Sequence, residues 1–331
     1  MNARSQHPPL NPAIHGRVYG INRRFFLNSL SLSTALVLTR MHGELASHRW
    51  KTAVGLNGFA SSERKYRREF PLKEILPFIH STGFDGIELL EGWRVGSYPD
   101  PVNEPRRMEA FVKQYTSNGL KVFSMQTGAS GAFSPERATR MQWLAGMRSK
   151  TLMAKQLGCD CLGMWPGGSL RGQSLQQAMV HLADSFRRMA DIAGEHGVLA
   201  AFEIEPPFVF NTEAHLRQIL ELTDHVNLKT IYDPSHFDLM NGSTGRPHEM
   251  LERIGVDQIG YVHLTDTDGK RRDGGTSKHL ACGDGHAQIP VSLERLKKGG
   301  FKGWIMIDAW EIPDPYDACR RGLHYIRKAM G

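Results

Sequence analysis

The sequence has few cysteines, and none of them forms a recognisable metal or redox motif. The four cysteines are Cys159, Cys161, Cys282 and Cys319. No two of them have the two-residue separation that is typical of zinc ribbons. Cys159 and Cys161 lie two positions apart on a predicted strand, a geometry poorly suited to a local disulfide. We therefore expect buried thiols without a redox function.

The chain also lacks a long apolar segment and a glycine-rich phosphate-binding turn. The uncharged apolar stretch at residues 29–39 is shorter than the ~20 residues that a membrane-spanning helix needs, so we expect no stable membrane span. The first predicted strand runs into GLNGFASS, which has no G-x-G-x-x-G pattern. A nicotinamide-dependent function is therefore not favoured.

Positive charge is concentrated at the N-terminus. The formal net charge of the whole chain is +7, but residues 1–50 contain six arginines and one glutamate. The remaining residues carry 35 basic and 33 acidic side chains and are nearly neutral. Such a surface lacks the broad positive field that dominates binding to nucleic acids. We expect no nucleic-acid partner.

What the chain does contain is a regular alternation of strand-like and helix-like segments. The apolar strand-like segments lie at residues 52–56, 84–90, 120–126, 159–165, 198–205, 227–233, 258–264 and 303–308. Between them lie stretches with apolar residues spaced by three and four, such as 72–83 and 175–197. This α/β alternation predicts a parallel sheet. Eight repeats favour a single closed (β/α)8 barrel over residues 51–331.

Four of the strand-like segments carry metal-binding types of side chain at or near their C-terminal ends. Glu203, Asp233 and His263 follow one another at intervals of thirty residues, and Asp308 ends the last segment. Because all strands of a parallel barrel point the same way, their C-terminal ends meet on one rim. Three carboxylates and one imidazole suit a single divalent metal ion, Mn or Mg first, with Co or Zn as replacements. We predict that these four residues bind one such ion.

The same residues carry a resemblance to a known family. The motifs occur in the order G-V-x-x-x-x-E ending at Glu203, D-x-x-H with Asp233 and His236, H-x-x-D with His263 and Asp266, and G-x-G at residues 283–285. With them the chain resembles the sugar phosphate isomerase/epimerase superfamily, the xylose isomerase-like TIM barrels that also include apurinic endonucleases. The family usually has a Glu where this chain has Asp308. The resemblance covers the chain from about residue 51 to the C-terminus.

The resemblance implies a metal-dependent enzyme that acts on a small sugar or keto-sugar. Its expected chemistry is proton transfer next to a carbonyl through an enediolate, with Glu203 and Asp308 as the acid-base pair. Return of the proton gives an epimerase or an isomerase, whereas loss of a β-substituent gives a dehydratase or lyase. The further alternatives are a metal-dependent phosphodiesterase or endonuclease and a non-catalytic sugar-binding barrel. The ends of the second to fourth strands lack histidine, which tells against the endonuclease.

Further side chains are candidates for substrate contacts, namely His236, Glu88, Glu205, Trp165 and His279. For the carboxylates the alternative is a salt bridge within the barrel, and for the other residues it is ordinary packing or loop ordering. His279 lies in a long polar segment, 265–288, which is a candidate lid because loops of this length are usually functional or disordered. Asp266, in the same segment, is expected to orient the region of His263.

The first fifty residues resemble an export signal. Arg23 and Arg24 precede Phe-Phe-Leu and the apolar stretch at residues 29–39, as in twin-arginine leaders, which export folded proteins. We therefore expect a leader at residues 1–50 and a periplasmic or otherwise exported protein. The alternative is an extra helix that covers the bottom of the barrel in a cytoplasmic protein. The sequence is compatible with a homo-oligomer but does not predict one.

Overall fold

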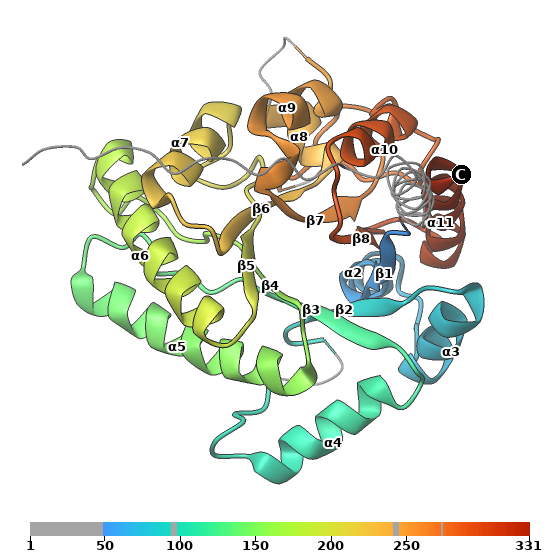
Figure 1. Ribbon diagram of the computed structural model, residues 1–331, viewed down its shortest axis with the longest axis horizontal. Helices are drawn as coiled ribbons and strands as arrows, with labels where there is room; N and C mark the ends of the chain where they lie inside the picture. Colours follow the sequence, from blue (N-terminus) through green and yellow to red (C-terminus); the bar gives the residue numbers. More distant parts are fainter. Residues whose placement is uncertain (1–48, 94–97, 241–244, 273) are drawn as a thin grey trace, which may run out of the picture. The chain divides into compact units, whose positions relative to one another are not determined.

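Eight parallel strands form a closed barrel with helices around it (Figure 1). The structure, a computed structural model, describes residues 49–93, 98–240, 245–272 and 274–331. Each strand pairs with the next one along the chain, and β8 pairs with β1 to close the barrel. The predicted fold, a single (β/α)8 TIM barrel, is confirmed.

The elements follow the predicted alternation of strands and helices. The strands are β1 (Lys51–Gly55), β2 (Gly86–Leu90), β3 (Lys121–Thr127), β4 (Cys161–Met164), β5 (Leu199–Phe202), β6 (Leu228–Tyr232), β7 (Ile259–Leu264) and β8 (Trp304–Ile307). The helices are α2 (Leu56–Tyr66), α3 (Leu72–Thr82), α4 (Pro105–Thr116), α5 (Arg137–Leu157), α6 (Leu175–Glu195), α7 (Glu213–Thr223), α8 (Pro234–Met240), α9 (Pro247–Ile254), the 3-10 helix η1 (Val256–Gln258), α10 (Ile289–Lys298) and α11 (Pro315–Met330). Every predicted strand segment overlaps one of these strands.

Local sequence signals explain where several helices begin and end. Ser174 caps the N-terminus of helix α6: its hydroxyl accepts the backbone N–H of Gln177, and the Gln177 side chain accepts the backbone N–H of Ser174. Helices α3 and α5 are followed by the C-cap residues Gly83 and Gly158, with φ angles of 90° and 72°. A residue without a Cβ adopts this left-handed conformation without strain. These glycines therefore set the turns that lead into β2 and β4.

The barrel interior is packed with side chains below its C-terminal rim. One buried cluster there comprises Ala53, Phe123, Cys161, Ala201, Ile231, Tyr261, Trp304 and Met306. The rings of Phe123 and Trp304 stack with their centroids 4.7 Å apart. Because side chains alternate between the two faces of a strand, the next inward positions after Ala201, Ile231, Tyr261 and Met306 lie at the rim. The packed interior thus forms the floor of the site described below.

Other expectations from the sequence can be compared with the structure. All four cysteines are free and buried, which confirms the predicted buried thiols. Within the part of the chain that the structure describes, no helix is long and apolar enough to cross a membrane. The predicted leader motif with Arg23 and Arg24 lies outside the described residues. The barrel forms a compact unit from Arg49 to Gly331.

Candidate metal and sugar-binding site

The four predicted metal ligands meet inside the C-terminal rim of the barrel. Glu203, Asp233 and Asp308 directly follow β5, β6 and β8, and His263 lies in β7. Each is two positions beyond an inward-facing residue of the packed interior, so strand alternation directs it toward the barrel axis. All four residues are buried, with no more than 4% of their surface exposed. Strand geometry alone therefore gathers three carboxylates and one imidazole.

His263 lies at the centre of this group. Its Nδ1 atom is 2.9 Å from Glu203 Oε1 and 3.8 Å from Asp308 Oδ2. Candidate ligand atoms of Glu203, Asp233 and His263 all lie within 4.8 Å of one another. Asp308 Oδ1 accepts hydrogen bonds from Asn57 Nδ2 and from the backbone N–H of Trp310, at 3.1 and 3.0 Å. These bonds leave Asp308 Oδ2 directed at the imidazole.

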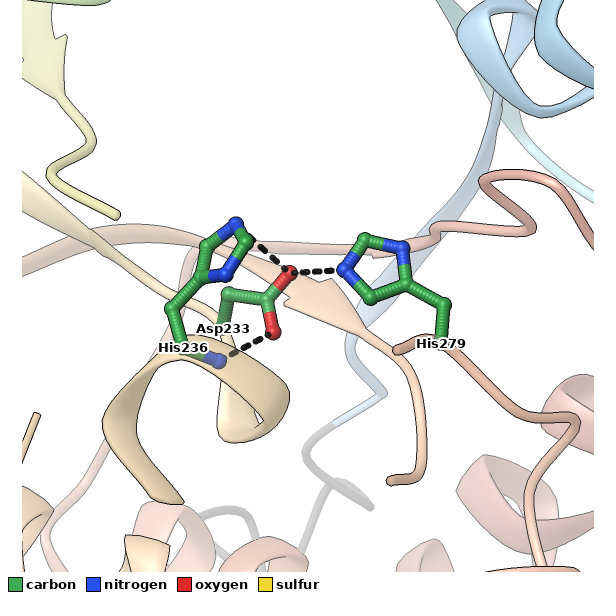
Figure 2. Close-up of side chains that lie close together, drawn as sticks. All are labelled: Asp233, His236 and His279. Carbon is green, nitrogen blue, oxygen red and sulfur yellow. Dashed lines mark hydrogen bonds and ion pairs between the residues drawn. The ribbon is translucent and has the colours of Figure 1, made fainter. Parts of the chain in front are cut away.

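Asp233 also belongs to a second close group, with His236 and His279 (Figure 2). Its Oδ2 atom lies 3.9 Å from His236 Nε2 and 3.8 Å from His279 Nε2. Its Oδ1 atom accepts the backbone N–H and hydroxyl of Ser235, each at 2.7 Å. Among the described residues, neither Asp233 Oδ2 nor either ring nitrogen of His279 has a hydrogen-bond partner.

These unpaired atoms fit a bound cation. A buried polar atom without a partner is costly, and a buried charge is more costly still. Asp233 Oδ2 is unpaired, completely buried and directed toward both groups. Carboxylate oxygens with imidazole nitrogens form a donor set that divalent metals accept. Three of the four predicted ligands, Glu203, Asp233 and His263, therefore fit a bound divalent ion, whereas Asp308 belongs to neither close group.

A cavity of about 390 Å³ lies over this cluster. Its apolar walls include Trp165, Phe208 and Trp310, and its polar lining includes Glu203, Glu205, His236, His279 and Asp308. The Trp165 indole donates to Glu203 Oε2 at 2.8 Å, which orients that carboxylate. Aromatic walls with a few convergent polar groups are typical of small-molecule sites. Such a lining can contact both the C–H face and the hydroxyls of a sugar.

Four of the five predicted substrate residues lie at the cavity, and the fifth contacts His263 instead. Four of them, Trp165, Glu205, His236 and His279, line the cavity, whereas Glu88 is not among its lining residues. Instead, Glu88 Oε2 lies 3.1 Å from His263 Nε2, on the side of the imidazole away from Glu203. His236 is fixed by Ser277, whose hydroxyl lies 2.6 Å from His236 Nδ1. That contact leaves His236 Nε2 facing Glu205 Oε2, at 3.6 Å.

The carboxylates of the site differ in their protonation. Burial raises the pKa of Asp308 to about 7, and repulsion from neighbouring carboxylates adds to this shift. Burial would also raise the pKa of Glu203, but the charge and hydrogen bond of His263 lower it to about 2. Burial lowers the pKa of His279 to about 4, so this imidazole is neutral near pH 7. Without a cation, protons on Asp308 and His263 offset the negative charge of the cluster.

The segment 265–288 folds back onto the rim as a hairpin. Antiparallel bridges pair Asp266 with Leu280 and Arg271 with Ser277. The Asp266 carboxylate accepts backbone N–H groups from residues 267, 283 and 287, at 2.9 to 3.0 Å. A Cβ on Gly285 would lie 2.3 Å from Asp266 Oδ1, which explains the second glycine of the G-x-G motif. Asp266 thus orders the segment that carries Ser277 and His279 to the site.

Sequence reasoning missed three contacts of the site. Asn57 follows β1, and the rule that strand ends meet on one rim could have identified it. Trp310 lies two residues beyond Asp308 and reaches the site through its backbone N–H and its ring. Ser277 had no such signal, because it reaches His236 only through the hairpin.

Comparisons with known proteins agree with this architecture. The model of the xylose isomerase-like TIM barrel family matches residues 76–329. The chain belongs to this family. One curated relative is the inosose dehydratase of Geobacillus thermodenitrificans, which is 24% identical over 250 residues that cover 69% of this chain and 83% of the relative.

Two similar solved structures share the barrel. An L-ribulose 3-epimerase is 16% identical, with a TM-score of 0.65 over 85% of this chain and 94% of that one. The IolI protein with a bound zinc atom is also 16% identical, with a TM-score of 0.65 over 85% of this chain and 98% of that one. At this level of identity the likeness shows the fold alone. Members of the family include metal-dependent sugar epimerases and dehydratases.

Proposed function

We propose that this protein is a divalent-metal-dependent isomerase or epimerase that transfers a proton next to the carbonyl of a sugar or keto-sugar. The observation that carries the proposal is the unpaired, buried Asp233 Oδ2 among candidate metal ligands at the floor of a cavity with tryptophan walls. Glu203, Asp233, His263 and Asp308 would hold one ion, with Mn or Mg first and Co or Zn as replacements. The zinc-binding structural relative is consistent with such a site.

The residues around the cavity can divide the proton transfer between them. A bound divalent ion supplies positive charge that acidifies the C–H group next to a carbonyl and stabilises the resulting enediolate. Glu203, held by Trp165, removes the proton from one side of the substrate. Asp308, held by Asn57 and the Trp310 backbone, returns a proton from the other side. Return to the same carbon epimerises it, and return to the neighbouring carbon isomerises an aldose to a ketose.

The other cavity residues would bind and orient the sugar. His236, His279 and Glu205 line the cavity. Trp165 and Trp310 offer flat apolar surfaces for the C–H face of the sugar ring.

A second candidate is a dehydratase, which the curated relatives named inosose dehydratase favour. In this reaction Glu203 takes the proton next to the carbonyl and the enolate then expels the β-hydroxyl. The hydroxyl leaves as water once it receives a proton, for which His236 is placed in the cavity. The first step is shared with epimerisation, and only the fate of the enolate differs.

One experiment tests both candidates. The metal-loaded protein is incubated in deuterated water with a panel of ketoses, aldoses and keto-glycosides. We expect at least one of these sugars to take up deuterium at a carbon next to its carbonyl. The product of an epimerase or isomerase would lose no atoms other than the exchanged proton, whereas the product of a dehydratase would lack one molecule of water. Glu203→Gln should abolish the exchange, whereas the exposed control Glu221→Gln should retain it. Absence of exchange across the panel would contradict both candidates.

We also propose that the protein is exported through its N-terminal leader. Arg23 and Arg24 followed by the apolar stretch at 29–39 support this proposal. Export in the folded state would allow the barrel to take up its ion before it leaves the cytoplasm.

A further inference from the structure

Glu88 is a buried carboxylate that the proposed reaction does not use. It lies on β2 and faces the barrel interior, with 1% of its surface exposed. Its contact with His263 joins β2 to β7 across the barrel, because these strands are not neighbours in the sheet. An isolated buried carboxylate is strongly unfavourable, so its presence there needs a reason.

The two ring nitrogens of His263 have different surroundings. Nδ1 faces Glu203 Oε1 at 2.9 Å and Asp308 Oδ2 at 3.8 Å, both on the side of the candidate ion. Nε2 faces Glu88 Oε2 at 3.1 Å. A nitrogen that binds a cation cannot also carry a proton, so in a metal-bound neutral imidazole the other nitrogen carries it. The acceptor next to Nε2 therefore decides which nitrogen is free to bind.

We propose that Glu88 is a positioning residue, which accepts the Nε2–H of His263 and thereby presents the Nδ1 lone pair to the metal ion. A carboxylate in this place fixes the tautomer and the ring orientation and makes the imidazole a stronger donor. The inference rests on the metal site of the proposed function but not on the reaction or the sugar.

The surroundings of Glu88 support this role over a substrate contact. Glu88 is not among the residues that line the cavity. Tyr261 lies beside it, and the Tyr261 hydroxyl is 3.4 Å from Ser124 Oγ. Tyr261 and Phe123 pack edge to face, with centroids 5.4 Å apart, in the apolar cluster below the site. Glu88 is thus enclosed between His263 and the packed floor, where a sugar does not reach.

The test measures metal binding directly. Zinc affinity is determined by competition with a chelator for the wild type, Glu88→Ala, Glu88→Gln and the control Glu91→Gln. Glu91 follows the same strand, but its carboxylate accepts from Lys150 and Thr127 rather than from His263. We expect Glu88→Ala to bind zinc roughly 10- to 100-fold more weakly. Glu88→Gln, whose amide oxygen can still accept the Nε2–H, should lose less, and the control should match the wild type.

Two spectra report on His263 itself. In the zinc-loaded wild type, nitrogen-15 NMR of histidine should show a protonated Nε2 and a metal-bound Nδ1 at His263. In the cobalt-loaded protein, Glu88→Ala should shift the visible absorption bands, because the donor strength and orientation of one ligand change. If Glu88→Ala does not fold, the NMR spectrum of the zinc-loaded wild type decides, because the inference requires a protonated Nε2 and a metal-bound Nδ1.

A purely structural ion pair predicts a different result. It would lower the stability of both Glu88 variants but leave zinc affinity and the cobalt spectrum unchanged, and this outcome would overturn the inference. Coordination through Nε2 in the NMR spectrum would overturn it as well. Because no sugar is used, a protein that binds zinc as expected but fails to exchange any substrate proton would refute the proposed function and leave the role of Glu88 intact.

Discussion

Asp308 offers the sharpest test of the site, because its side chain is shorter than the Glu that the resemblance implies and its two oxygens have separate contacts. Oδ1 is held by Asn57 and the Trp310 backbone, and Oδ2 lies 3.8 Å from His263 Nδ1. Asp308→Glu would advance the carboxylate by about 1.5 Å, one C–C bond. That shift would bring an oxygen into contact with His263 or break both bonds at Oδ1.

The expected loss of activity follows from this displacement. Misplacement of a reacting group by about 1 Å can cost on the order of 100-fold in rate, and we expect a loss of that order for Asp308→Glu. Asp308→Asn should abolish turnover, because it removes both the charge and the ionisable proton. Asp257→Asn, in η1 away from the C-terminal strand ends, is the matched control and should behave like the wild type.

The assay combines solvent deuterium exchange with elemental analysis of bound metal and a thermal unfolding curve. Unfolding data separate a damaged site from a damaged fold. If Asp308→Asn kept near-normal exchange and metal content, Asp308 would be neither a ligand nor an acid-base group. Glu205, which also lines the cavity, would then be the next candidate, since the Glu311 carboxylate is paired with Lys65 at 2.5 Å.

Three further predictions concern metal binding, pH and export. The variants Asp233→Asn and His263→Ala should each lose most of the bound metal, because Asp233 belongs to both close groups of candidate ligands and His263 to one. Elemental analysis that finds undiminished metal in both variants would rule out the site. Asp308 should give the stability of the metal-free protein a downward slope between about pH 4 and 7, since its folded-state pKa of about 7 lies above the unfolded value and the group must ionise at high pH. Asp308→Asn should flatten that slope in chemical unfolding measured across pH, and an unchanged slope would contradict the assignment. Replacing Arg23 and Arg24 together with Lys should keep the protein in the cytoplasm of its native host, whereas an unchanged location on fractionation would favour the structural-helix alternative.

The fold could be predicted because each strand carries its own signal. Continuous apolar runs such as 227–233 and 303–308 contain the observed β6 and β8, and the helical spacing between runs indicates parallel pairing. The convergence of Glu203, Asp233, His263 and Asp308 needs only that all strands point the same way. Local pattern and chain direction were sufficient for these features.

The rest of the site depends on distances that no local pattern contains. The contact between Glu88 and His263 crosses the barrel between strands that are far apart in the sequence. Nothing in the segment GIELL distinguishes a cavity-lining carboxylate from one that faces a histidine. Likewise His279 reaches Asp233 only because the hairpin pairs Asp266 with Leu280.

The charge balance of the site explains why such a polar cluster can exist in a packed barrel. Glu88, Glu203, Asp233 and Asp308 are four carboxylates that are each at least 96% buried, and like charges at this spacing repel strongly in a poorly solvated interior. The folded chain relieves the repulsion with protons, because Asp308 has a raised pKa and Glu203 and Glu88 raise that of His263. A divalent ion supplies the same compensation without protons, so ion and protons compete for one set of atoms. Apolar side chains in these positions are often as stable or more stable, so the buried carboxylates contribute little to stability by themselves, and a bound ion would give them a function.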